Sequence, residues 1–199
     1  MEPISVIRAS AMPLPRADVD TDQIIPSDWL KRVERTGFGA GLFAEWREDP
    51  DFVLNDPRYS GAQILVAGSN FGVGSSREHA VWALQDYGFK AIVSPRFGDI
   101  FRNNCTKVGI VPVVVKSEVA ERLFSAIARN PKTEIVVDVT NLRITSKDAG
   151  VDEPFELDEF TQYRFLNGLD DIGLTMLHGQ AIDDFEAGRP GFMPSLTRR

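Results

Sequence analysis

Short runs of branched apolar residues alternate with stretches of helical periodicity along most of this chain, and this alternation constrains the fold more than any other feature of the sequence. Several runs contain no polar residue, which is typical of strands buried on both faces of a sheet. The pattern predicts an α/β fold, a mixed sheet or half-barrel with flanking helices. The predicted strands are 4–7, 64–67, 91–93, 111–115, 135–139 and 142–145, and the predicted helices are 76–87, 117–129, 159–166 and 170–187.

The length of the chain fits a single domain. It has 199 residues, and neither an internal repeat nor a linker rich in glycine, serine or proline divides it. Its apolar content of 43% is enough to build a core. We therefore expect one domain over residues 1–199, in which residues 188–199 form a frayed tail because of their glycine and proline content.

The charge of the chain limits its partners. The sequence has 29 acidic and 22 basic residues, which gives a net charge of -7. This balance argues against nucleic acid or an anionic membrane as a partner, whereas a local basic pocket could still bind a small anion. No apolar run approaches the roughly 18 residues of a membrane span, and the first residues lack a secretory signal pattern. We expect a cytoplasmic protein.

The chain offers few metal ligands. Its one cysteine, Cys105, excludes an internal disulfide, and an iron-sulfur cluster normally needs about four cysteine thiolates. Its two histidines, His79 and His178, lie far apart without a neighbouring ligand pattern. The aspartates in residues 18–22 resemble the start of a calcium loop, but the glycine and glutamate that such a loop needs are missing. We expect no metal on this chain, so metal chemistry would have to come from a partner.

The most informative segment is the predicted turn between a strand and a helix at residues 68–79. Glycines at positions 68, 72 and 74 allow a sharp turn and a close approach of a ligand to the backbone. Ser75 and Ser76 are predicted to open the helix, whose first N–H groups attract anions, and Arg77 adds a fork suited to a carboxylate. The turn matches neither the Walker pattern nor the dinucleotide fingerprint, which makes a nucleotide a weak hypothesis.

A purely structural role for the same serine is also open. Ser75 and Glu78 have the spacing of a capping box, and such a box would stabilise the helix by about 1 kcal/mol. From these residues alone, capping is the stronger explanation. Against it, a cap needs one hydroxyl, whereas the sequence supplies two beside an arginine and three glycines.

Three motifs together resemble one family. They are Asp20-Thr-Asp-Gln-Ile-Ile-Pro26, the run Gly-Ser-Ser-Arg-Glu-His-Ala that ends at Ala80, and the segment from Ser94 to Cys105 followed by Gly109-Ile-Val-Pro112. In this order and in a chain of this size, they are similar to the small subunits of 3-isopropylmalate dehydratases. The resemblance implies a single swivelling β/β/α domain of the aconitase C-terminal type, the swivel domain of the aconitase superfamily.

The resemblance also implies an activity. Its members belong to a two-chain hydro-lyase of leucine biosynthesis that interconverts 2-isopropylmalate and 3-isopropylmalate through isopropylmaleate. The large subunit of such an enzyme holds a [4Fe-4S] cluster, which acts as a Lewis acid on the departing hydroxyl. The family assigns removal of the proton beside a carboxylate to the first serine of Gly-Ser-Ser-Arg, which is Ser75 here. A related hydro-lyase for homoaconitate or methylmalate (citraconate), or a non-catalytic anion-binding module, remains an alternative.

Further residues take roles around Ser75. We expect Arg77 and the backbone of Ser76 to hold the substrate carboxylate. Asp22 matches a family aspartate and, with Thr21 and His79, is expected to support the residues that touch substrate. The alternatives are that Asp22 is a solvent-facing turn residue and that His79 is a packing or surface histidine.

Substrate choice is expected to depend on the segment after Pro26. Relatives that bind citrate use a basic residue in this region, whereas an isopropyl group needs an apolar wall. Counting from Asp22 without gaps places Val33 at that position, with Leu30 beside it. We expect both side chains to contact the isopropyl group. A slip of one residue would place Arg32 there and favour a tricarboxylate.

Overall fold

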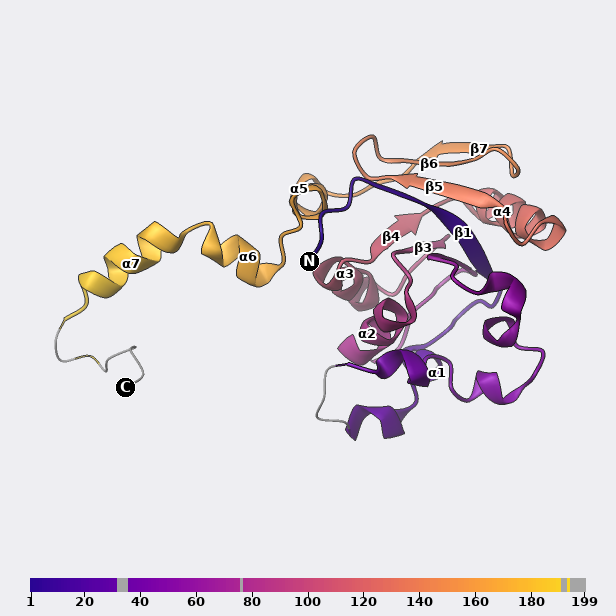
Figure 1. Cartoon of the computed structure of the whole chain (residues 1–199), viewed down its shortest axis with the longest axis horizontal. Coiled ribbons are helices and arrows are strands. Elements are labelled where there is room, and N and C mark those ends of the chain that lie inside the picture. Colours follow the sequence, from indigo (N-terminus) through magenta and orange to yellow (C-terminus); the bar gives the residue numbers. More distant parts are fainter. Residues whose placement is uncertain (32–35, 76, 191–192, 194–199) are drawn as a thin grey trace.

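The computed structural model describes residues 1–31, 36–75, 77–190 and 193. Its centre is a seven-stranded mixed sheet with the strand order β4-β3-β2-β1-β5-β6-β7 (Figure 1). The strands are β1 (Val6–Leu14), β2 (Ile64–Ala67), β3 (Ala91–Ser94), β4 (Val111–Val114), β5 (Glu134–Asp138), β6 (Arg143–Ser146) and β7 (Val151–Pro154). The predicted mixed sheet is therefore confirmed.

Strand β1 joins two half-sheets of different kinds. Its residues 11–14 pair in parallel with β2, and its residues 6–10 pair antiparallel with β5. Strands β2, β3 and β4 continue the parallel half, while β5, β6 and β7 form an antiparallel half. Because one long strand serves both halves in turn, the sheet curls into the predicted half-barrel (Figure 1).

Helices cover the parallel half of the sheet. Helices α2 (Glu78–Tyr87) and α3 (Asp99–Val108) connect successive parallel strands and pack on each other. Right-handed crossovers place both on the same face. Helix α4 (Ser117–Arg129) packs across β1, β2 and β3. With both faces covered, every residue of β2 and β3 is buried, as their continuous apolar runs predicted.

The structure corrects several predicted elements. The strand predicted at 4–7 is the nine-residue β1, and β7 and α3 were not predicted. Strand β7 contains aspartate, glutamate and proline, so its sequence lacks an apolar run. The helix predicted over 170–187 is two helices, α6 (Asp171–Met176) and α7 (Gly179–Ala187), because the chain bends before Gly179.

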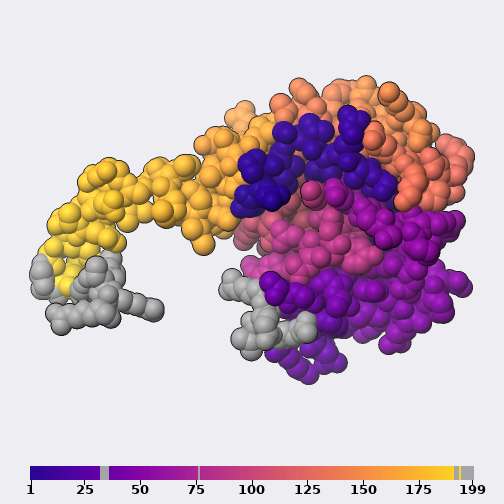
Figure 2. Space-filling model, viewed as in Figure 1, coloured from indigo at the N-terminus to yellow at the C-terminus, as the bar shows by residue number. Residues whose placement is uncertain are grey.

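Helices α6 and α7 form a projection that we call the C-terminal arm (residues 171–187). The arm follows helix α5 (Glu159–Asn167) and stands clear of the sheet and of the helices that cover it (Figures 1 and 2). The predicted frayed tail at 188–199 lies mostly outside the described residues, and the single-domain assignment stays a prediction. Within the described part of the chain, no helix is long and apolar enough to cross a bilayer.

Candidate functional site

Three loops meet at the carboxyl ends of the parallel strands. The loop after β2 is tied to the loop after β1 by a hydrogen bond from Gly72 N to Val19 O of 2.7 Å. It is tied to the loop after β3 by bonds from Phe71 N to Arg96 O of 3.0 Å and from Gly98 N to Phe71 O of 2.9 Å. These hydrogen bonds fix the positions of the three loops relative to one another. The carboxyl ends of strands in open α/β sheets are also where ligands usually bind.

Close packing of these loops explains why position 72 of the predicted turn is a glycine. Gly72 has a φ of +73°, and a Cβ at this position would lie 2.2 Å from the ring of Phe101. A side chain would strain the backbone and collide with an aromatic ring that is almost fully buried. Gly98 faces the same loop, since its Cβ would lie 2.4 Å from the carbonyl oxygen of Gly72. The two loops can approach this closely only because both positions are glycine.

The loops enclose a cavity of about 210 Å³. Its walls come from the turn after β2, from α1 (Thr21–Ile24) and from the start of α3. The residues that line it are Thr21, Gly72, Val73, Gly74, Ser75, Arg77, Gly98, Asp99, Ile100 and Phe101. Small-molecule sites usually enclose about 300 to 1,000 Å³, so this cavity is smaller than the usual range.

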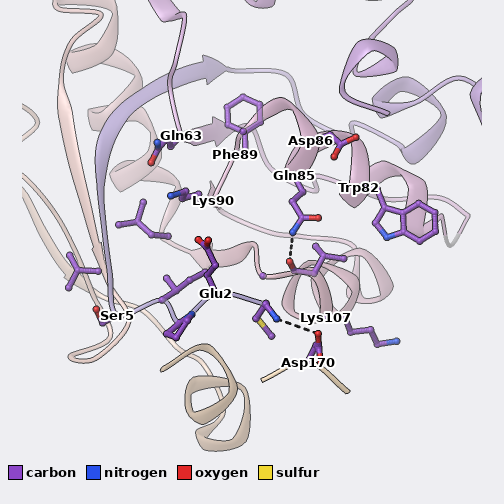
Figure 3. Close-up of a pocket in the computed structure, with 18 of the residues that line it drawn as sticks. Glu2, Ser5, Gln63, Trp82, Gln85, Asp86, Phe89, Lys90, Lys107 and Asp170 are labelled. Carbon is purple, nitrogen blue, oxygen red and sulfur yellow. Dashed lines mark hydrogen bonds and ion pairs between the residues drawn. The ribbon is translucent and has the colours of Figure 1, made fainter. Parts of the chain in front are cut away.

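A larger cavity of about 850 Å³ lies elsewhere, beside the N-terminal residues and the C-terminal ends of α2 and α3 (Figure 3). Its polar groups include Gln85, Lys90 and Lys107, and Asp170 lies at its border. None of the predicted site residues lines it. The smaller cavity is the candidate site, because the glycine turn, Ser75 and Arg77 line it.

Ser75 lies at the open side of the smaller cavity. Its side chain is exposed, and its hydroxyl donates or accepts no hydrogen bond with a described residue. Its backbone is fixed, because the Thr21 hydroxyl donates a bond of 2.8 Å to the Ser75 carbonyl oxygen. Ser75 is thus an exposed residue on a backbone that the Thr21 hydroxyl holds in place.

The predicted capping box at Ser75 is wrong. Helix α2 begins at Glu78, and its N-cap is Arg77, which is extended and makes no side-chain capping bond. Ser75 therefore lies before the helix rather than at its cap, and the serine pair does not open the helix. Ser76 lies outside the described residues. With the cap excluded, helix stability no longer explains a serine at position 75.

Thr21 and Asp22 are placed by a capping box of their own. The Asp20 carboxylate accepts a bond of 2.8 Å from Gln23 N, and the Gln23 side chain accepts one of 3.0 Å from Asp20 N. This box opens the short helix α1, in which Thr21 is buried and Asp22 faces outward. The sequence motif that begins at Asp20 therefore has a local structural reason.

Arg77 forms an ion pair with Asp22. The Nη1 atom of Arg77 is buried and forms no hydrogen bond with a described residue beside this ion pair. The Arg77 side chain as a whole is 20% exposed. Asp22 is 56% exposed, which agrees with the alternative of a solvent-facing residue. That alternative does not account for its ion pair with Arg77. The pair ties α1 to the start of α2 and holds a guanidinium at the wall of the cavity.

Two other predicted residues lie away from the cavity. His79 packs between Phe38 and Trp82, with ring centroids 5.3 Å and 4.7 Å apart. This position matches the packing alternative and gives His79 no contact with the cavity. Leu30 lies in the 3-10 helix Ser27–Lys31, half-buried against the core, and does not line the cavity. Val33 lies outside the described residues.

One wall of the site was not predicted from the sequence. Residues 98–101 belong to the segment between Ser94 and Cys105 that carried the resemblance, yet no role was assigned to them. In the structure they line the cavity, and Ile100 is 54% exposed there. A glycine followed by an acidic residue, four residues after the end of a buried strand, was the available signal for a helix start at this edge.

The described residues contain no group of three or more His, Cys, Asp and Glu side chains arranged to hold a metal ion. Cys105 is fully buried, and burial raises the pKa of its thiol well above the usual range. A thiol in that state is protonated and behaves as a small apolar side chain. The residues of this chain therefore do not fit an iron-sulfur cluster.

A substitution at Thr21 tests how the Ser75 backbone is positioned. Thr21 is 2% exposed, so Thr21→Val should lower the free energy of unfolding by about 1 kcal/mol through the lost hydrogen bond. It should also reduce catalytic turnover, because the carbonyl of Ser75 loses its anchor. Thr21→Ser keeps the hydroxyl and is the control. The free energy of unfolding of both variants is to be measured by urea unfolding, and their turnover as kcat. Equal turnover of the two variants would contradict this role.

The fold and the site together define a domain of the aconitase C-terminal type, and comparisons with known proteins agree. The family model of the aconitase C-terminal domain matches residues 1–118. The model of the C-terminal domain of the 3-isopropylmalate dehydratase small subunit matches residues 171–199. The solved 3-isopropylmalate dehydratase (leuD) of Methanocaldococcus jannaschii superposes with a TM-score of 0.68 at 23% identity, covering 90% of this chain and 99% of that one. This likeness shows the shared fold.

Full-length relatives narrow the class to one family. The 3-isopropylmalate dehydratase small subunit of Parafrankia sp. (strain EAN1pec) is 58% identical over 99% of this chain and 100% of its own length. The protein of the same name from Rubrobacter xylanophilus is 57% identical over 98% of this chain and 100% of its own length. The chain belongs to the family of 3-isopropylmalate dehydratase small subunits, as its motifs predicted.

Proposed function

We propose that this chain works with a large subunit as a hydro-lyase that interconverts 2-isopropylmalate and 3-isopropylmalate, through isopropylmaleate, in leucine biosynthesis. Membership of the family supports the hydro-lyase class and the existence of a large subunit. The observation that carries the proposal is the arrangement around Ser75. Its hydroxyl is engaged by no described residue, its backbone is anchored by Thr21, and a guanidinium lines the same small cavity.

Ser75 is proposed as the base that removes the proton beside a substrate carboxylate. A serine alkoxide is a strong base, so its surroundings must stabilise the negative charge by several kcal/mol. In the isolated chain the Ser75 side chain is exposed to water, which weakens such stabilisation. We therefore expect the large subunit to cover the open side of the cavity and exclude water, so that Ser75 becomes basic only in the assembled enzyme.

Arg77 and the Ser76 backbone are proposed to hold the substrate carboxylate. A guanidinium has five N–H donors, so the ion pair with Asp22 leaves donors for a second carboxylate. Asp22 then keeps the fork in one orientation, and Thr21 keeps the Ser75 backbone at a fixed distance from it. Holding the carboxylate in this way would orient the acidic C–H toward the Ser75 hydroxyl.

The [4Fe-4S] cluster is proposed to belong to the large subunit. This chain has one cysteine, which is fully buried, so it cannot offer the set of thiolates that a cluster requires. Its own residues are therefore assigned only to proton removal and carboxylate binding. That nucleic acid and membranes are not partners, and that the enzyme is cytoplasmic, stay predictions from the sequence.

Assembly with a cluster-bearing large subunit tests this proposal. The two chains are to be co-expressed and purified without oxygen, and formation of the unsaturated intermediate is to be measured for isopropylmalate, for the hydroxy acid that dehydrates to homoaconitate, and for methylmalate. We expect the highest kcat/KM with isopropylmalate. A higher value with one of the other diacids would assign the chain to a related hydro-lyase, and binding without turnover of any of them would favour an anion-binding module.

Substrate choice is proposed to depend on Val33 together with Leu30, which does not line the small cavity in the isolated chain. Val33→Arg would place a cation where an apolar wall is expected, so kcat/KM for isopropylmalate should fall by about 100-fold or more because the isopropyl group meets a charge. Val33→Leu keeps the wall apolar and serves as the matched control. If the arginine variant keeps the full preference for isopropylmalate, Val33 does not contact the isopropyl group.

A further inference from the structure

The C-terminal arm exposes large apolar side chains that the other described residues leave uncovered. Ile172 is 75% exposed, and Met176 and Phe185 are each 69% exposed. No other described helix or strand packs extensively on α6 or α7. A concentration of exposed large apolar side chains in one short segment, including methionine and phenylalanine, is typical of a surface that another molecule covers.

The exposed side chains lie on one face of each helix. Ile172 and Met176 are four residues apart in α6, and Ile182 and Phe185 are three residues apart in α7, so each pair shares a helical face. The other face of α7 is polar, since Gln180 Nε2 donates a hydrogen bond of 2.9 Å to Asp184 Oδ1. The arm is thus two short amphipathic helices without a partner for their apolar faces among the described residues.

The root of the arm is fixed to the body. The Asp170 carboxylate accepts a bond of 2.8 Å from Gly173 N at the start of α6, and it also forms an ion pair of 3.3 Å with the N-terminal amine of Met1 (Figure 3). Arg164 Nη2 lies 2.9 Å from the Asp171 carboxylate, and its side chain is 11% exposed. These contacts direct the arm away from the body (Figure 2) and away from the 850 Å³ cavity at its root.

The negative charge of the arm favours a different protein over a second copy of this chain as its partner. Residues 171–187 contain four acidic side chains and neither lysine nor arginine, and the whole chain carries -7. Packing the arm on a second copy's arm would bring eight carboxylates together. The surface that fits the arm is an apolar groove bordered by lysine or arginine.

We propose that the C-terminal arm docks in such a basic-bordered apolar groove on the large subunit. The inference rests on the proposed function, which supplies a large subunit for this chain to bind. The arm lies within residues 171–199, the part of the chain that matches a family model specific to small subunits, whereas the catalytic turn lies in the part matched at 1–118. Docking and chemistry would therefore be carried by separate segments.

The test measures affinity and activity separately. The variant Met176→Glu/Phe185→Glu should weaken binding to the purified large subunit by about 30-fold or more, measured by calorimetry. Gln180→Glu adds an acid on the polar face of α7 and is the matched control, with affinity expected near that of the unmodified chain. At saturating large subunit the double variant should regain kcat, because Ser75 and Arg77 are untouched.

Three outcomes would overturn the proposal. The first is unchanged affinity of the double variant for the large subunit. The second is self-association of the unmodified chain that the double variant abolishes while large-subunit affinity stays the same. The third is an affinity that does not fall with added salt, since a basic border requires it to fall. Failure of the proposed function looks different, because the unmodified complex would then assemble without isomerising any substrate.

Discussion

Replacing Ser75 with alanine is expected to lower kcat of the assembled enzyme by about 1,000-fold, within the range for loss of a positioned general base. The substrate carboxylate should still bind, because Arg77 and the backbone of the turn remain, so KM should change much less than kcat. Steady-state rates of isopropylmaleate formation by the two-chain enzyme measure both quantities.

The same variant carries an internal control for folding. The Ser75 hydroxyl makes no hydrogen bond with a described residue, and the bond from Thr21 goes to the Ser75 carbonyl, which alanine retains. The free energy of unfolding of the isolated chain should therefore change by less than about 0.5 kcal/mol. A variant that is equally stable and equally active would exclude Ser75 as the base.

Arg77→Lys is expected to raise KM by about 10 to 100-fold, because lysine keeps the charge but not the planar fork. In the structure one side of the fork already pairs with Asp22, so the remaining N–H groups are the ones proposed for substrate. A lysine ammonium cannot serve both carboxylates with the same geometry. Binding of a non-reacting diacid and the KM of the two-chain enzyme measure the loss.

Asp22→Asn is the companion to this variant. It keeps the shape of the side chain and removes its charge, so it should weaken the orientation of Arg77 and raise KM less than Arg77→Lys does. If Asp22 acts only through Arg77, the double variant should be no worse than Arg77→Lys alone. Additive losses would instead show that Asp22 has a separate role in the site.

Much of the fold follows from local patterns. Strands β2 and β3 are apolar at nearly every position because both faces are covered, and the amphipathic α4 was predicted with its observed bounds. The half-barrel is less local, since it depends on β1 changing partner from β5 to β2 along its length. The polar strand β7 is held by its pairing with β6, which no window of the sequence reveals.

Local patterns also explain why several residues of the candidate site lie together. Ser75, Arg77 and Thr21 line one cavity, and Asp22 contacts Arg77, because a glycine turn and a capped short helix place them. The spacing of Ser75 and Glu78 suggested a cap, but the extended backbone at Arg77 delays the helix. Contacts made across the sheet edge, such as Phe101 against Gly72, require the third dimension and were not predicted.

The central claim is that this chain supplies the base and the carboxylate clamp but cannot complete the reaction without its partner. The most direct measurement compares three anaerobic preparations with isopropylmalate: this chain alone, the cluster-bearing large subunit alone, and the two combined. We expect the unsaturated intermediate and the isomer only from the combined preparation. Complete isomerisation by the purified chain alone would contradict the claim.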